Sequence, residues 1–191
     1  YGNALLTSSP LERRREVRLD GGSVVNFNGT DHRIVRGLLT GEIALRGGGG
    51  TLRVATTHLD HISEAERSTQ AAHVVRELAA AEDGGGPSTL LLGDLNALTR
   101  ADYDDAQWQL HEAHRRERGW EPPADAAASG NSLALLAAAN FSDVSRAVLS
   151  LQTGGAIKDL ISKLAAGIAL TEEQLAPIYP SRRAEELEKE Q

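Results

Sequence analysis

The sequence predicts an α/β domain, and three observations support this class. A strand-like stretch at residues 52–57 is followed by a helical pattern from Ser63 and then by a continuous apolar stretch, typical of a buried strand, at residues 89–93. A connection of this length permits the two strands to pair in parallel. Aromatic residues make up only 4% of the chain, so the core must consist mainly of Leu, Val, Ile and Ala, which suit layered α/β folds.

Composition limits the kinds of protein that the chain can be. With 191 residues and 40% hydrophobic content, the chain suits one domain or a large piece of a bigger one. No apolar run approaches the ~18 residues that a transmembrane helix needs. The chain lacks methionine and starts at Tyr1, so we expect it to be a piece of a longer protein. The absence of cysteine excludes disulfides and thiolate metal sites and leaves the compartment open.

The net charge of −7 is unevenly distributed along the chain. Residues 1–60 carry 8 basic and 6 acidic side chains, a balance of +2, so the later part of the chain holds all of the acidic excess. An acidic surface opposes diffuse binding to nucleic acid, which relies on Lys and Arg side chains that neutralise phosphates. A local basic face remains open around a group of four arginines (Arg13, Arg14, Arg15 and Arg18), although a solvated turn is the commoner explanation of such a run.

Further strands are expected on both sides of a glycine-rich connection. Residues 3–8 resemble a strand that ends at Ser9-Pro10, and residues 15–19 resemble its antiparallel neighbour. Residues 32–45 form a longer strand candidate with breaks near Gly37 and Gly41. The four glycines at 47–50 lack a following Lys-Ser/Thr and a helix, so they indicate a hairpin connection and not a phosphate loop.

Helix signals dominate the rest of the chain. Ser63-Glu-Ala-Glu66 is a capping box, and the helix that it begins carries an apolar stripe (Ala71, Val74, Val75, Leu78 and Ala79) before it ends at residues 83–87. A second helix is expected from Thr99, with Tyr103, Ala106, Gln107, Leu110 and His114 on one side. Shorter helices are expected at residues 133–139 and 156–170, a capping signature stands at Thr171, and a charged tail follows from residue 181.

Polar side chains follow both central strands where each strand ends. His58, Asp60 and His61 follow the first strand, and Asp94 and Asn96 follow the second. The carboxyl ends of parallel strands lie at one edge of the sheet, where open α/β sheets bind ligands. Asp94 and Asn96 are expected on one face of the extended backbone. A carboxylate that holds a metal or orients water, beside an amide that donates to an anionic oxygen, is the pairing that phosphoester hydrolysis needs.

Four segments in this order resemble the endonuclease/exonuclease/phosphatase superfamily of divalent-metal phosphoesterases. Tyr1-Gly-Asn-Ala-Leu-Leu-Thr-Ser8 is similar to the family's G-N-A-[IL]-L-S strand, and Arg36-Gly-Leu-Leu39 to the strand before its histidine. Thr57-His58-Leu59, with Arg67 and Gln70 on the next helix, is similar to T-H-L…R-x-x-Q. Gly93-Asp94-Leu95-Asn96-Ala97 matches G-D-[FL]-N. A four-residue match alone is common by chance, but four in order are more specific.

The resemblance implies a fold and a set of roles. The fold is two packed mixed β-sheets flanked by helices, a four-layer αββα sandwich, here incomplete at both ends. A partial domain would occupy residues 1–150, and residues 151–191 would form a helical extension or tail. In the catalytic roles, Asp94 would orient the water and bind part of a metal site, Asn96 would donate to a phosphate oxygen, and His58 would polarise another. Supporting positions would be Asn3, Asp60, His61, Arg67 and Gln70.

The resemblance also implies partners and a cofactor. The cofactor would be Mg²⁺ or Mn²⁺, and the ligand a phosphorylated small molecule, a lipid headgroup or a nucleic acid. The family's metal-binding glutamate precedes the segment that starts here at Tyr1, and its terminal Asp-His pair has no counterpart after Asp143. We therefore predict little or no hydrolytic activity for this chain alone.

Two alternatives remain open at this stage. Residues 56–61 resemble part of the zinc-binding H-x-H-x-D-H signature of metallo-β-lactamases, with Thr56 in place of the first histidine. That hypothesis leaves the Gly-Asp-Leu-Asn segment unexplained. The other alternative is a non-catalytic remnant of a phosphoesterase domain that serves in binding.

Overall fold

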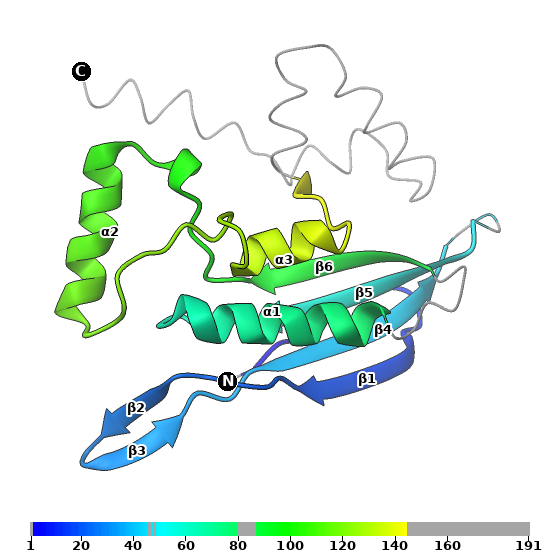
Figure 1. Ribbon diagram of the computed structural model, residues 1–191. Coiled ribbons are helices and arrows are strands. Elements are labelled where there is room, and N and C mark those ends of the chain that lie inside the picture. Colours follow the sequence, from blue (N-terminus) through cyan, green and yellow to red (C-terminus); the bar gives the residue numbers. More distant parts are fainter. Residues whose placement is uncertain (1, 46, 48, 80–86, 145–191) are drawn as a thin grey trace, which may run out of the picture. The chain divides into compact units, whose positions relative to one another are not determined.

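The computed structural model describes residues 2–45, 47, 49–79 and 87–144 (Figure 1). The chain divides into two compact units, and the description below concerns the first, Tyr1–Ala44 with Gly50–Asp143. The helix predicted at 156–170, the capping signature at Thr171 and the charged tail lie outside the described residues, as does the predicted extension 151–191. Within the described part, no helix is both long and apolar enough to cross a membrane.

A mixed four-stranded sheet forms the centre of this unit. Its strands are β1 (Glu12–Arg18), β4 (Gly37–Ala44), β5 (Thr51–His58) and β6 (Ser88–Asp94), in the order β1-β4-β5-β6. β4 pairs antiparallel with both β1 and β5, whereas β5 and β6 run parallel. The α/β class, the parallel pair and the hairpin connection at the glycine run are therefore confirmed. A separate hairpin consists of β2 (Val24–Phe27) and β3 (Thr30–Arg33).

The helix α1 (Glu64–Ala79) covers one face of the sheet, as Figure 1 shows. Ala71, Val74 and Leu78 of its predicted apolar stripe are buried in a cluster that includes Leu38 of β4 and Ala55 of β5. Two shorter helices follow β6, namely α2 (Asp105–Glu117) and α3 (Ser132–Ala138). The described residues thus supply one four-stranded layer with helices, together with a two-stranded hairpin, and the two packed sheets of the predicted sandwich stay a prediction.

The strand predicted at residues 3–8 is wrong. This segment has no regular structure, and the antiparallel partner of β1 is β4. β1 pairs with β4 on one side, and no described strand pairs with the other side of β1, so residues 3–8 do not join the sheet. One hydrogen bond, from Asn3 Nδ2 to the Gly37 carbonyl at 3.1 Å, ties the segment to the start of β4.

The unbroken apolar run at 89–93 is typical of a buried strand, and an expectation of burial from that run is wrong. Leu90 and Leu91 of β6 are half-buried, and Leu92 is 45% exposed. β6 is an edge strand of the described sheet, so the apolar run that resembles a fully buried strand has only one neighbouring strand, β5.

The two predicted helix starts differ from those observed. The Ser63 hydroxyl accepts a 3.4 Å hydrogen bond from the Glu66 amide, but the Glu66 carboxylate accepts from the Gly22 amide at 2.6 Å and does not complete a capping box. The second helix begins later than predicted. Thr99 precedes a single 3-10 turn, and Asp104 caps α2 through a reciprocal bond with Gln107.

Candidate functional site

The register of β5 and β6 places His58 directly beside Asp94 at the carboxyl ends of the two strands. The Leu59 amide donates to the Asp94 carbonyl at 3.0 Å, which continues the ladder by one bond. His58 Nε2 lies 3.8 Å from Asp94 Oδ2, so both side chains point to the same side of the sheet. The imidazole is mostly buried, whereas the carboxylate of Asp94 is 65% exposed. The Asp94 carboxylate, a hydrogen-bond acceptor, is thus exposed to solvent beside the His58 imidazole, which can donate a hydrogen bond.

A glycine makes this close approach of β5 and β6 feasible. Gly93 has φ of +129°, a conformation that side chains disfavour, and a Cβ atom there would lie 1.8 Å from the Thr57 carbonyl oxygen. Only glycine fits between the strands at this position. Gly93 therefore fixes the path of the β6 backbone immediately before Asp94.

Asn96 lies near Asp94 for a different reason from the one predicted. The extended backbone stops at Asp94, and Asn96 adopts φ of +49°, in the left-handed region. The Asn96 amide donates to Asp94 Oδ1 at 2.9 Å, a local turn of the kind that Asp and Asn favour. Asn96 Nδ2 donates to the Leu59 carbonyl at 3.0 Å, which fastens the loop after β6 to the loop after β5. The second Nδ2 proton stays available for another acceptor.

Two buried side chains of α1 hold the loop that follows His58. Gln70 Oε1 accepts from the Asp60 amide at 2.7 Å, and Arg67 Nη1 donates to the Asp60 carbonyl at 3.0 Å. Arg67 Nε is itself paired with Glu64 at 2.9 Å. Both residues are almost fully buried. They position the loop through the backbone of Asp60 and lie away from solvent.

Asp60 is fully buried and organises the same loop. Its carboxylate accepts from the backbone amides of Ser23, Ile62 and Ser63 and from the Ser23 hydroxyl, at 2.8–3.0 Å. Burial raises the pKa of Asp60, but the hydrogen bonds from Ser23, Ser63 and Ile62 outweigh it and hold the pKa below its usual value. With its oxygens engaged by four donors, Asp60 serves the structure of the loop.

His61 lies against a cation and an aromatic ring. Its Nδ1 is 3.1 Å from Arg36 Nη2, and its ring meets the edge of Trp120 at a centroid distance of 4.6 Å. The pKa values of His61 and His58 are both lowered, first by burial and then by the positive charge of Arg36. Asp94 counteracts this effect on His58 and Asp60 counteracts it on His61. Both rings are therefore mainly neutral near pH 7.

Two arginines that the sequence reasoning did not single out, Arg36 and Arg115, are buried at this end of the sheet. Arg115 of α2 donates to three backbone carbonyls, those of His61, Ile62 and Glu121. It ties α2 to the loop after β5. The sequence offers no signal for this role, because Arg115 lies in a charged run (His114 to Arg118) that resembles a solvated helix face.

The described residues do not fit a complete magnesium site. Mg²⁺ prefers octahedral oxygen coordination, usually with one or two carboxylates. Within the described ranges, no three His, Asp or Glu side chains gather closely enough to hold a metal ion. Asp94 offers one exposed carboxylate, and Asp60 is engaged by its four donors. The same geometry disfavours the zinc alternative, because Asp60 and His61 do not converge with His58 on one point in this part of the chain.

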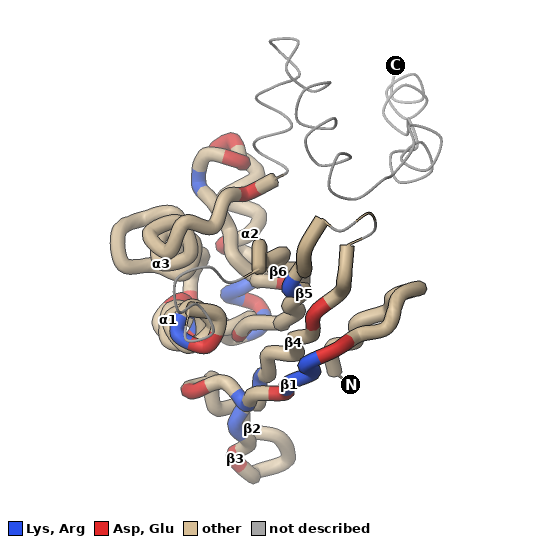
Figure 2. Tube along the Cα trace, turned by 90° about the vertical axis from the view of Figure 1, so that its right-hand side faces the viewer, with Lys and Arg blue, Asp and Glu red and all other residues tan. Residues whose placement is uncertain are grey.

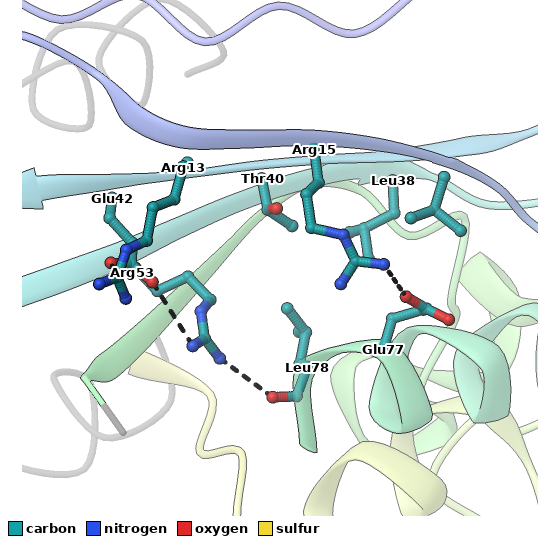
Figure 3. Close-up of a pocket in the computed structure, with 10 residues that line it drawn as sticks. Arg13, Arg15, Leu38, Thr40, Glu42, Arg53, Glu77 and Leu78 are labelled. Atoms are coloured by element: carbon teal, nitrogen blue, oxygen red, sulfur yellow. Dashed lines mark hydrogen bonds and ion pairs between the residues drawn. The ribbon is translucent and has the colours of Figure 1, made fainter. Parts of the chain in front are cut away.

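A separate pocket of about 200 Å³ lies between the sheet and the end of α1, and Figure 3 shows its lining. Its charged side chains pair with one another: Arg15 with Glu77 at 3.1 Å, and Arg13 with Glu42 at 3.3 Å. Arg53 donates to the Leu78 carbonyl at 3.0 Å. Figure 2 shows the basic segments of β1 along this edge of the sheet. His58, Asp94 and Asn96 take no part in the pocket.

Comparisons with known proteins give partial structural neighbours. No family model matches the chain, and no curated protein matches it. Each of the following solved structures matches 46% of this chain. An endonuclease/exonuclease/phosphatase family protein from Bacteroides thetaiotaomicron is 21% identical with a TM-score of 0.36, and 31% of its own chain is covered. A mannosyl-6-phosphatase of the same organism is 21% identical with a TM-score of 0.37, and 33% of its chain is covered. The human Nocturnin catalytic domain is 23% identical with a TM-score of 0.34, and 30% of its chain is covered. The match thus spans about a third of each neighbour's length.

Proposed function

We propose that this chain carries the phosphate-binding and water-orienting part of a metal-dependent phosphoester hydrolase of nuclease or phosphatase type. One observation carries the proposal: the tips of two parallel strands bring His58 Nε2 to 3.8 Å from Asp94 Oδ2, and Asn96 is hydrogen-bonded to the same carboxylate. The four ordered segments that resemble endonuclease/exonuclease/phosphatase proteins support the same chemistry. The proposal includes the four-layer αββα sandwich as the fold.

The groups at the strand tips have complementary tasks in such a reaction. The exposed Asp94 carboxylate accepts a proton from a water molecule and orients the water's lone pair toward phosphorus. The free Nδ2 proton of Asn96 donates to a phosphate oxygen, and neutral His58 donates from a ring nitrogen to another. Donors fixed before the reaction stabilise the negative charge that builds on those oxygens.

The cofactor and the ligand class belong to the proposal as well. We infer Mg²⁺ or Mn²⁺ from the resemblance, with Asp94 as the one ligand in the described chain. The ligand is a phosphorylated small molecule, a lipid headgroup or a nucleic acid, because loops outside the shared strands decide among these. With one carboxylate ligand among the described residues we expect weak binding of the cation, and therefore little or no hydrolysis by this chain.

A second candidate function is phosphate binding without hydrolysis. It is favoured by the hydrogen bond from Asn96 Nδ2 to the Leu59 carbonyl, which gives Asn96 a structural task that does not depend on catalysis. A binding module would keep the donors and dispense with the metal. The two functions share the site and differ in turnover.

Phosphate binding and turnover on the purified chain test both candidates. Calorimetry with inorganic phosphate should give a saturable isotherm that Asn96→Ala and His58→Ala weaken by at least tenfold. Arg33→Ala, on the separate β2–β3 hairpin, serves as a control with unchanged affinity. Turnover of a phosphodiester in Mg²⁺ or Mn²⁺, lost on Asp94→Ala, would show that this chain alone is a competent hydrolase. Equal phosphate binding by wild type, Asn96→Ala and His58→Ala would refute the proposed site.

A further inference from the structure

Arg36 lies at the same edge of the sheet as the proposed site. It directly precedes β4, whose start is level with the end of β5 because Leu38 pairs with Thr57. Its carbonyl accepts from the Leu19 amide at 2.9 Å, which fixes the backbone there. The start of β4 therefore lies beside the end of β5, and the end of β5 lies beside the end of β6, so Arg36 comes from the same edge of the sheet as His58 and Asp94.

The guanidinium of Arg36 is buried but incompletely satisfied. The residue is 9% exposed. Nη2 contacts His61 Nδ1 at 3.1 Å, and Nε has no hydrogen-bond partner among the described residues. A buried cation without an anionic or carbonyl acceptor is costly, since it has lost its hydration without replacement. An unsatisfied donor of this kind needs an explanation, and a missing ligand is one.

The other buried arginines of the described chain differ from Arg36 in their hydrogen-bond partners. Arg53 donates to the Leu78 carbonyl and lies 3.7 Å from Glu42. Arg67 pairs with Glu64 and donates to the Asp60 carbonyl, and Arg115 donates to three carbonyls. Each therefore has oxygen acceptors. Arg36 contacts a neutral imidazole in their place, so within the described ranges its guanidinium has no anionic or carbonyl oxygen partner.

We propose that Arg36 is the cation that binds the phosphate oxyanion of the ligand at the His58–Asp94 strand tips. The inference rests on the proposed function, since it assigns a binding partner to the same site. A guanidinium presents planar, fixed donors that match two oxygens of a phosphate group. The electrostatic influence of Arg36 on both His58 and His61 is consistent with a position next to the site.

The hydrogen bond to His61 gives Arg36 a defined orientation. Because the guanidinium carries only donors, His61 Nδ1 must be the acceptor, and the ring proton is then on Nε2. The edge contact of the His61 ring with Trp120 holds that ring in place. His61 thus acts as a positioning residue that turns the remaining donors of Arg36 toward the ligand.

Phosphate calorimetry on Arg36 variants tests this assignment. Arg36→Gln should weaken the binding of inorganic phosphate at least tenfold, and Arg36→Lys, which keeps the charge without the planar fork, should fall between. Arg53→Gln is the matched control, because Arg53 is equally buried on a neighbouring strand but has oxygen acceptors, and its phosphate affinity should equal that of wild type. Dimethyl phosphate in place of inorganic phosphate separates recognition of a diester from recognition of a terminal phosphate.

A measurement on the wild-type chain keeps the test independent of how the variants fold. The ¹⁵Nε resonance of Arg36 should shift saturably as phosphate is added. A folded Arg36→Gln chain with wild-type phosphate affinity, or an Arg36 resonance that stays fixed at saturation, would overturn the inference. If His58→Ala and Asn96→Ala lose phosphate while Arg36→Gln retains it, the proposed function survives alone. If only Arg36→Gln loses phosphate, Arg36 is an anion site and the hydrolase proposal fails.

Discussion

Replacement of Asp60 by alanine should destabilise the protein strongly. The fully buried carboxylate accepts four hydrogen bonds, from the amides of Ser23, Ile62 and Ser63 and the Ser23 hydroxyl. A hydrogen bond to a charged group contributes ~1.5–3 kcal/mol. The four contributions do not add fully, because the opened loop rehydrates some donors, and we expect a loss of about 4 kcal/mol. That is a large part of the ~5–15 kcal/mol that holds a domain folded.

Urea unfolding followed by circular dichroism measures this loss. With an m-value of about 2 kcal/mol/M, the midpoint should fall by about 2 M. Asp31→Ala is the control, since Asp31 accepts one exposed hydrogen bond from Asn26, and its cost should stay within ~0.5 kcal/mol. The pKa of Asp60 is lowered in the folded state, so its contribution is present above its unfolded value of 3.8 and disappears as the pH falls through the folded pKa. Equal midpoints for the two variants, or an Asp60→Ala cost that persists in acid, would refute the reasoning.

Three further predictions concern the strand tips. Gly93→Ala should cost about 4 kcal/mol, because the new Cβ atom meets the Thr57 carbonyl at 1.8 Å, whereas Gly29→Ala, in open space at φ of +80°, should cost ~1–2 kcal/mol in the same urea assay. Arg115→Met keeps the packed stem but leaves three carbonyls without their donor, so its melting temperature should fall, by an amount equivalent to ~3 kcal/mol. Sulfate keeps its charge across pH 5–8, so it is a suitable anion for a pH series. Its affinity should rise as the pH drops below the lowered pKa of His58, because a bound anion favours the protonated ring. His58→Gln should reduce that pH dependence of the sulfate affinity in calorimetry.

The central strands were predictable because their signal is local. β6 contains an unbroken apolar run, β5 is rich in β-branched and apolar residues, and the helix between them carries a 3.6-residue apolar period, so class, order and parallel pairing follow from the sequence. The placement of polar residues after those strands puts His58 and Asp94 at one edge. The motif segments then supply the chemistry that periodicity alone does not indicate.

The remaining features depend on contacts that no local pattern contains. Residues 3–8 carry a strand-like local pattern, but the strand that pairs with β1 is β4, which lies some twenty residues further along the chain. Glu66 satisfies the capping pattern in sequence, but its carboxylate accepts a hydrogen bond from the Gly22 amide, which lies 44 residues away in the sequence. Arg36 is visible in the sequence only as part of a strand motif, because its burial and its unsatisfied Nε arise from the tertiary fold.

The imidazole of His58 reports on the central claim that the carboxyl ends of β5 and β6, together with Arg36 before β4, form one phosphate site. Its ring ¹⁵N resonances can be followed by two-dimensional NMR while inorganic phosphate is added to the wild-type chain. The account predicts a saturable shift of the His58 nitrogens with the same dissociation constant as the calorimetric isotherm, with no shift for His32 on the β2–β3 hairpin. Unchanged His58 resonances at phosphate saturation, with shifts confined to residues around the Arg13–Glu42 pocket, would contradict it.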